Sequence, residues 1–160
     1  LCSINIILIA VHVLKPSKVL DNFLYTICIP GALAALLFPT WTKLPFLNFM
    51  HIHSFTVHIL LAMYPIILFA AKEIRPKLKD LPKTMALLLF FAFVAFCANC
   101  IFDTNFMFLR SASKGNPLYY FEVAFGNHLI GFPVLIFAIV LVMYMPIVIA
   151  QYVMVQVGNG

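Results

Sequence analysis

An uncharged stretch from Phe49 to Ala71 constrains the fold of this chain more than any other feature. It contains no Asp, Glu, Lys or Arg, and it ends abruptly at Lys72, where the charged segment KEIRPKLKD begins. An apolar run of more than about 18 residues is long enough to cross the roughly 30 Å hydrocarbon core of a bilayer as a helix. We therefore expect a membrane-spanning helix over residues 49–71.

The composition extends this expectation to the whole chain. Of the 160 residues, 64% are hydrophobic and 9% are charged, which is too little charge to cover the surface of a soluble domain. The sequence predicts an all-α fold, a polytopic transmembrane helix bundle in which five spans are visible of six or seven. We expect one transmembrane domain over 1–152, whose first helix begins upstream of Leu1, and a C-terminal tail over 153–160. The expected spans are 1–14, 22–40, 49–71, about 84–102 and about 131–151.

The basic residues predict the orientation of this multi-pass membrane protein. Half of the ten Lys and Arg residues lie in the loop 72–83. Short loops rich in Lys and Arg face the cytoplasm and contact anionic headgroups, so this loop is predicted to be cytoplasmic. The basic residues of this loop account for the net charge of +5. We therefore expect membrane phospholipid rather than nucleic acid as the partner.

Polar side chains form a seam along the helix at 49–71. At about 100° per residue, His51, Ser54, His58 and Pro65 fall on one face, whereas His53 lies off it. An imidazole at this depth is costly unless it faces protein or a water-filled cavity. The functional interpretation is an intramembrane site in which His51 and Ser54 line the substrate path. The alternative is a histidine that hydrogen-bonds between packed helices.

A depth argument connects this seam to a cysteine in the first helix. Cys2 precedes Lys15, at the inner boundary, by about 20 Å of helix, and His58 precedes Lys72 by about 21 Å. The two helices run in the same direction, so both side chains lie at nearly the same height. A thiol with a pKa of about 8.5 becomes a useful nucleophile when an imidazole takes its proton. The candidate is a Cys–His dyad, and the alternative is a small buried cysteine with an unrelated histidine.

The remaining Cys and His residues have simpler interpretations. Cys97 and Cys100 are spaced as C-x-x-C but lack the second half of a zinc site, so small residues at a helix contact are the better interpretation. We expect no metal and no cofactor. His12 lies near the inner boundary and is interpreted as an interfacial anchor, and His128 precedes the last span.

A polar cluster follows the fourth span. Asn99 and Asn105, if they turn inward, could donate hydrogen bonds to an oxyanion or line the substrate site. Asp103 and Arg110 could contact a phospholipid headgroup or pair with one another.

Several short motifs, in this order and spacing, resemble a known family. They are LCSI at 1–4, GALAALLFP at 31–39, His58 followed 17 residues later by Arg75–Pro76, and N-x5-NFMFL at 99–109. Together they resemble the YwaF-type bacterial integral membrane proteins, a family related to the vertebrate transmembrane protein 164 family of Cys/His lipid acyltransferases. The resemblance implies a bundle of six or seven helices in which Cys2 and His58 act in acyl transfer.

The leading functional hypothesis is a membrane-embedded phospholipid acyltransferase or hydrolase. Cys2 would attack an acyl ester, and His58 would activate the thiol and then protonate the departing alkoxide. Two alternatives stay open. One is a small transporter or channel whose polar seam lines a pathway, and the other is a haem or quinone oxidoreductase that uses His51, His58 and His128.

Overall fold

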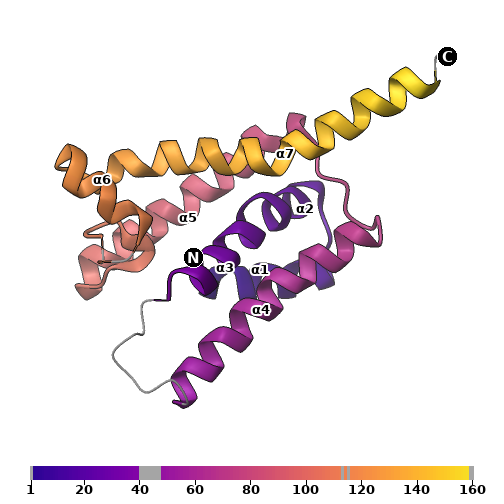
Figure 1. Cartoon of the computed structure of the whole chain (residues 1–160). Coiled ribbons are helices and arrows are strands. Elements are labelled where there is room, and N and C mark those ends of the chain that lie inside the picture. The colour runs from indigo at the N-terminus through magenta and orange to yellow at the C-terminus, as the bar shows by residue number, and fades with distance from the viewer. Residues whose placement is uncertain (1, 40–47, 113, 115, 159–160) are drawn as a thin grey trace.

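The structure is a computed structural model that describes residues 2–39, 48–112, 114 and 116–158 (Figure 1). The described residues form helices and turns without a strand, which confirms the all-α prediction. The helices are α1 (Cys2–Leu14), α2 (Lys18–Phe23), a π-helical turn (Leu24–Cys28), α3 (Ile29–Leu37), α4 (Phe49–Ala70), α5 (Leu81–Phe102), α6 (Pro117–Phe125) and α7 (Gly131–Gly158). Short 3-10 turns occupy Leu78–Asp80, Phe106–Phe108 and His128–Ile130.

Among the described residues, four helical segments are long and apolar enough to cross a membrane. They are Lys18–Leu37, Phe49–Ala70, Leu78–Phe102 and His128–Val153. The apolar helix α1 is shorter, at 13 residues. The region before the last span folds as α6 and a 3-10 turn. The helix α7 continues through Gly158, so residues 153–158 of the predicted tail are helical, and 159–160 lie outside the described residues.

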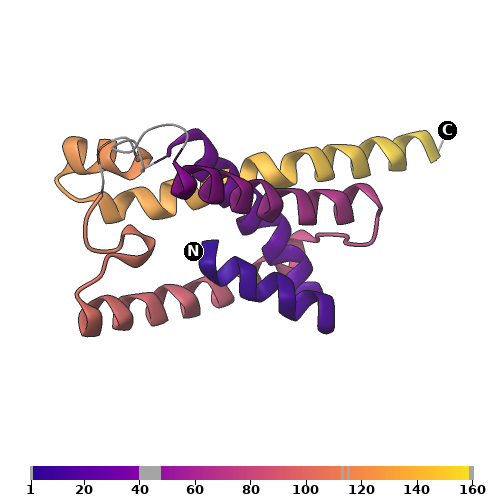
Figure 2. The ribbon, with the colours of Figure 1, turned by 90° about the horizontal axis from the view of Figure 1, so that it is seen from below.

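The continuous segment 18–37 is the centre of the bundle. In its most apolar stretch of 18 residues, 56% is buried inside the protein, whereas the corresponding share in 128–153 is 6%. Figure 2 shows this segment crossing between α1 and α5 on one side and α4 and α7 on the other. Its side chains Phe23, Leu24, Cys28 and Ala32 are fully buried. The other long helices therefore leave much of their apolar surface for lipid.

The π-helical turn has a local cause in Pro30. A proline has no N–H, so it cannot bond the carbonyl of Thr26, four residues earlier, and its ring crowds that carbonyl. The turn widens instead, and the Ile29 N–H donates to the carbonyl of Leu24. In the widened turn the Thr26 hydroxyl donates to the Tyr144 hydroxyl of α7 at 3.1 Å. The irregularity thus joins the central segment to the last span.

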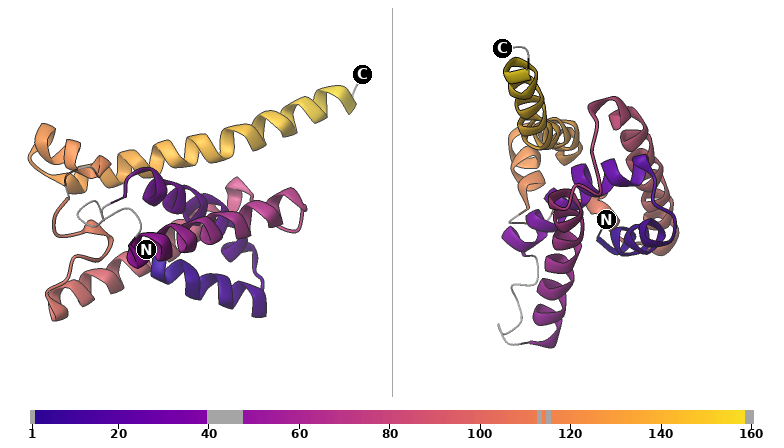
Figure 3. Two further views of the ribbon diagram at one scale, coloured as in Figure 1. Left: turned by 60° about the horizontal axis from the view of Figure 1, so that its bottom comes forward. Right: turned by 90° about the vertical axis from the view of Figure 1, so that its right-hand side faces the viewer.

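The two Lys-rich connections lie at the same end of the bundle. The Asn22 side-chain amide donates to the Lys77 carbonyl at 2.9 Å, and the Lys77 N–H donates back to Asn22 Oδ1 at 2.8 Å. These bonds tie the start of the central segment to the loop 72–83, as the alternation of spans requires. Figure 3 shows α6 at the opposite end. That the end with the basic loop faces the cytoplasm stays a prediction.

His12 has a different environment from the one predicted. It is not an exposed interfacial anchor, because the residue is buried with 6% exposure. Its Nε2 lies 2.9 Å from Asp21 Oδ1, and its Nδ1 lies 2.8 Å from the Tyr64 hydroxyl. A carboxylate only accepts, so Nε2–H donates to Asp21, and in the neutral imidazole Nδ1 accepts from Tyr64. The network joins α1, α2 and α4, whose apolar sequences alone do not specify these partners.

Replacing Asp21 with alanine is expected to destabilise this junction. The variant leaves Nε2–H of the buried His12 without an acceptor, which should lower the free energy of unfolding by about 1–3 kcal/mol. Reversible unfolding of the purified protein in mixed micelles measures the change. Asp103→Ala is the control, because the Asp103 side chain is 91% exposed in its pair with Arg110 and an exposed pair contributes at most about 1 kcal/mol. Equal losses in the two variants would contradict a structural role for the His12 network.

Candidate active site

A cavity of about 400 Å³ lies at the end of the bundle opposite the basic loop. It is bounded by the start of α1, most of α3 and the residues that follow it, the first half of α4, the loop after α5 and the first turns of α6 and α7. Its polar lining residues are Cys2, His51, Ser54, His58 and Asn116. Its apolar and small lining residues are Gly31, Ala34, Ala35, Leu36, Phe38, Pro39, Phe55, Met107, Phe108, Pro117, Leu118 and Phe132. A small polar group in an apolar pocket is typical of sites for apolar ligands.

The polar seam of α4 faces this cavity. Asn48 caps the helix by accepting from the Met50 N–H at 2.9 Å, which sets where the helical repeat begins. His51, Ser54 and His58 then line the cavity together, while His53 is exposed on the other side of the helix. The structure therefore places three of the four residues of the predicted face, His51, Ser54 and His58, in the wall of one cavity.

Cys2 enters the cavity from the first turn of α1. It is half-buried and packs against a core cluster that includes Leu24 and Cys28 of the central segment and Leu61 of α4. This packing places the thiol beside the helix that carries His58. The structure thus brings the two residues of the predicted dyad into the wall of one cavity.

The hydrogen bonds of His58 define the proton positions on its ring. Nδ1 lies 2.6 Å from the Ser54 carbonyl oxygen and 3.5 Å from the Ser54 hydroxyl. A carbonyl oxygen only accepts, so Nδ1 carries the proton and donates it. In the neutral ring Nε2 therefore keeps its lone pair. A backbone carbonyl fixes the tautomer here, and the free nitrogen is the one that could act as a base.

The thiol of Cys2 and the ring of His58 share the cavity without a hydrogen bond between them, among the contacts of the described residues. Catalytic hydrogen bonds are often long or absent before substrate binds and form in the complex. His51 lies seven residues, about two helical turns, nearer the start of α4 than His58. Its ring is tilted against that of Phe55, with ring centroids 6.1 Å apart.

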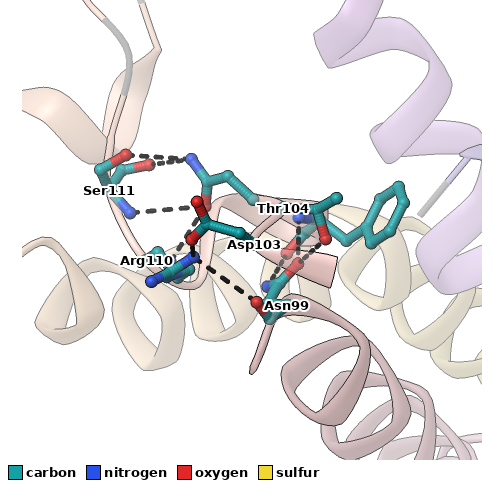
Figure 4. Close-up of polar contacts among 7 residues, drawn as sticks. Asn99, Asp103, Thr104, Arg110 and Ser111 are labelled. Atoms are coloured by element: carbon teal, nitrogen blue, oxygen red, sulfur yellow. Dashed lines mark hydrogen bonds and ion pairs between the residues drawn. The ribbon is translucent and has the colours of Figure 1, made fainter. Parts of the chain in front are cut away.

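Asn99 holds the loop after α5 rather than facing the cavity. It is fully buried, and its Oδ1 accepts from the Phe106 N–H at 2.6 Å and from the Thr104 hydroxyl at 3.0 Å. Its Nδ2 donates to the Phe106 carbonyl at 3.0 Å (Figure 4). The amide is therefore occupied by the loop, and Asn99 is not among the described residues that line the cavity.

Asn105 is also occupied by this loop. Its Nδ2 donates to the carbonyl and hydroxyl of Ser111 at 2.9 and 3.0 Å, and its Oδ1 accepts from the Arg110 N–H at 3.0 Å. The Arg110 guanidinium pairs with Asp103 at the exposed edge of the loop (Figure 4). The predicted pairing of Asp103 with Arg110 is present, and contact of either with a headgroup stays a prediction.

The same loop supplies cavity residues that the sequence analysis missed. Met107 and Phe108 line the cavity and adopt left-handed backbone conformations, with φ of 59° and 56°. Such values are uncommon outside glycine, and Asn99 holds the turn that imposes them. Asn116, also missed, caps α6 by accepting from the Leu118 N–H at 3.0 Å. Its position before Pro117 is a helix-start signal that the sequence contains.

The described residues contain no group of three His, Cys, Asp or Glu side chains that could hold a metal ion. Cys97 and Cys100 are free thiols on α5; Cys97 is half-buried and Cys100 is exposed. His128 is buried in the turn before α7 and lies outside the described lining of the cavity. The described lining also has no Asp or Glu, the residues with which transporters commonly couple ions.

Comparison with known proteins gives one result. The sequence model of the TMEM164 family matches residues 1–144 of the chain. No curated protein matches, and no solved structure matches. The match confirms the predicted relation to the transmembrane protein 164 family, whereas the likeness to the YwaF-type bacterial proteins stays a resemblance.

Proposed function

Because this chain belongs to the TMEM164 family, we propose that it is a membrane-embedded phospholipid acyltransferase or hydrolase with a Cys–His dyad. The observation that carries the proposal is the shared cavity, to which α1 contributes the Cys2 thiol and α4 the His58 imidazole. The fixed tautomer of His58 supports it, because the ring nitrogen that is free to take a proton is the one without a backbone partner.

The first half of the reaction makes a thioester. His58 Nε2 takes the thiol proton, and Cys2 Sγ attacks the carbonyl carbon of an acyl ester. The C–S bond forms while the carbonyl electron pair moves onto oxygen. The tetrahedral intermediate collapses, the ester C–O bond breaks, and His58 returns its proton to the departing glycerol oxygen. The products are a lysophospholipid and an acyl group on Cys2.

The second half reverses these roles. The hydroxyl of an acceptor, or water, gives its proton to His58 Nε2 and attacks the thioester carbonyl. The C–S bond breaks, and the thiolate recovers the proton from the imidazolium. An alcohol acceptor gives acyl transfer, and water gives hydrolysis.

The lining of the cavity suits a lipid substrate. Apolar side chains and the small residues of α3 form most of the wall, which matches the hydrocarbon of an acyl chain. We expect His51 and Ser54 to line the path beside the reacting ester, and Asp103 and Arg110, at the exposed edge of the loop, to contact the headgroup.

The transporter and oxidoreductase alternatives find less support. The described cavity lining lacks a carboxylate that would couple an ion. His51 and His58 lie on the same helix, and His128 is outside the described lining, so the histidines do not face one another across this cavity as two ligands of a haem would.

The test is to locate the acyl intermediate. The purified protein is placed in lipid nanodiscs with a phospholipid that carries an alkyne-tagged acyl chain. We expect tag on the peptide that contains Cys2, released by hydroxylamine as a thioester is. Cys28→Ala is the matched control and should keep the tag, because Cys28 is fully buried and its thiol donates to the Leu61 carbonyl. Turnover of the phospholipid without tag on Cys2 would overturn the proposal.

A further inference from the structure

Asn5 is the most unusual polar residue of α1. It is fully buried, with an exposed fraction of 0%. Neither Nδ2 nor Oδ1 of its side chain hydrogen-bonds to any described residue. A buried amide without partners is strongly unfavourable, so a group of this kind calls for a functional explanation.

Two other buried asparagines show how this fold normally treats such a side chain. Asn22 has 1% exposure, and both the Nδ2 and the Oδ1 of its side chain are hydrogen-bonded to the backbone of Lys77. Asn99, with 0% exposure, is bonded to Thr104 and to both backbone groups of Phe106. Asn5 is the exception among these three buried asparagines. It lies three residues after Cys2, the proposed nucleophile.

The geometry of α1 directs Asn5 toward Cys2. Residues three apart in an α-helix lie on the same face, with Cβ atoms about 5–6 Å apart. The Cα–Cβ bonds of a helix tilt toward its N-terminus, so the Asn5 side chain leans over the turn that contains Cys2. Asn5 itself is not among the described residues that line the cavity, so its amide would reach an acyl group on the Cys2 sulfur only from the α1 side of that sulfur.

We propose that the Asn5 side-chain amide donates a hydrogen bond to the oxyanion that forms when Cys2 attacks an acyl ester. The proposal rests on the proposed function. It gives Asn5 the role that the sequence analysis assigned to Asn99 and Asn105, whose amides hold the loop after α5. A donor fixed in a dry, buried position stabilises developing negative charge without reorganisation, which is the condition for an effective oxyanion site.

Two reactions of the same thiol separate this role from a structural one. Acylation of Cys2 by a phospholipid passes through an oxyanion, whereas alkylation by iodoacetamide is a direct displacement at carbon that forms none. In Asn5→Leu, which keeps the side-chain size and removes the amide, we expect acylation of Cys2 to slow by about 10²–10³-fold. Alkylation of Cys2 should proceed at the wild-type rate.

The rates of Cys2 acylation and Cys2 alkylation are also measured in the control variants. Ser3→Ala changes an exposed residue of the same helix and should leave both reactions unchanged. Asn5→Ala serves as a second variant and should give the same selective loss if leucine impairs folding. Acylation of the variants at the wild-type rate would overturn the role of Asn5 alone. Parallel loss of acylation and alkylation would also overturn it, because it would show a displaced thiol. A wild-type protein that phospholipid never acylates would overturn the proposed function and this inference together.

Discussion

Replacing His58 with alanine is expected to slow acyl transfer through Cys2 by about 10²–10⁴-fold, the range that a positioned general base contributes. The Ser54 carbonyl accepts from Nδ1 at 2.6 Å and leaves Nε2 as the base, so the variant loses the group that takes the thiol proton. At neutral pH a thiol with a pKa of about 8.5 is only a few per cent thiolate. The variant should also lose the acid that protonates the departing glycerol oxygen.

The measurement is the initial rate at which the acyl tag reaches Cys2 in nanodiscs, with Cys2→Ala as the baseline for labelling elsewhere. His53→Ala is the matched control, because His53 is on the same helix and is exposed away from the cavity. It should retain the wild-type rate. If His53→Ala and His58→Ala lost activity equally, or if neither did, His58 would not be the base.

Replacing Asn99 with alanine is expected to lower the free energy of unfolding by about 3 kcal/mol, at the upper end of the cost of unpaired buried groups. The variant removes three bonds of a fully buried amide, to the Phe106 N–H, the Phe106 carbonyl and the Thr104 hydroxyl. Met107 and Phe108 should then leave their left-handed conformations, which the loop imposes. Since both residues line the cavity, binding of the acyl chain should weaken as well.

Reversible unfolding in mixed micelles gives the stability, and the concentration dependence of Cys2 acylation gives the binding. Asn105→Ala is the control within the same loop, because Asn105 is exposed and water can replace its partners, so its cost should stay below about 1 kcal/mol. A large loss of acylation in Asn99→Ala with unchanged stability would contradict this interpretation and would favour a direct role of the Asn99 amide in the chemistry.

Much of the candidate site could be predicted because it depends on local periodicity. The repeat of the α-helix puts His51, Ser54 and His58 on one face, and the rise per residue puts Cys2 level with His58. These rules need only the positions of the residues along the chain. These rules did not single out Asn5, the oxyanion donor that we propose, although an asparagine one turn after a cysteine within an apolar helix is a signal of function in a membrane.

The loop after α5 could not be predicted in the same way. Asn99 and Asn105 are polar residues at a helix end, and sequence position alone leaves open whether their amides face a substrate or the backbone of their own loop. The structure shows the second arrangement, since Phe106 and Ser111 return to them. His12 was misread for a similar reason, because its partner Tyr64 lies 52 positions away in the sequence.

The sequence by itself determined that this protein is a bundle of apolar helices, where the four long helices run, and which face of α4 is polar. These properties follow from hydropathy and helical repeat, which act over one segment at a time. Only the tertiary structure decided that α1, α3, α4, the loop after α5, α6 and α7 enclose one cavity. It also decided that the buried amides of Asn22 and Asn99 are hydrogen-bonded while that of Asn5 is not. The physical reason is that a membrane-spanning helix is apolar on nearly all sides, so its sequence pattern carries little information about which neighbour it packs against. The partners of its polar side chains are fixed only when distant segments meet.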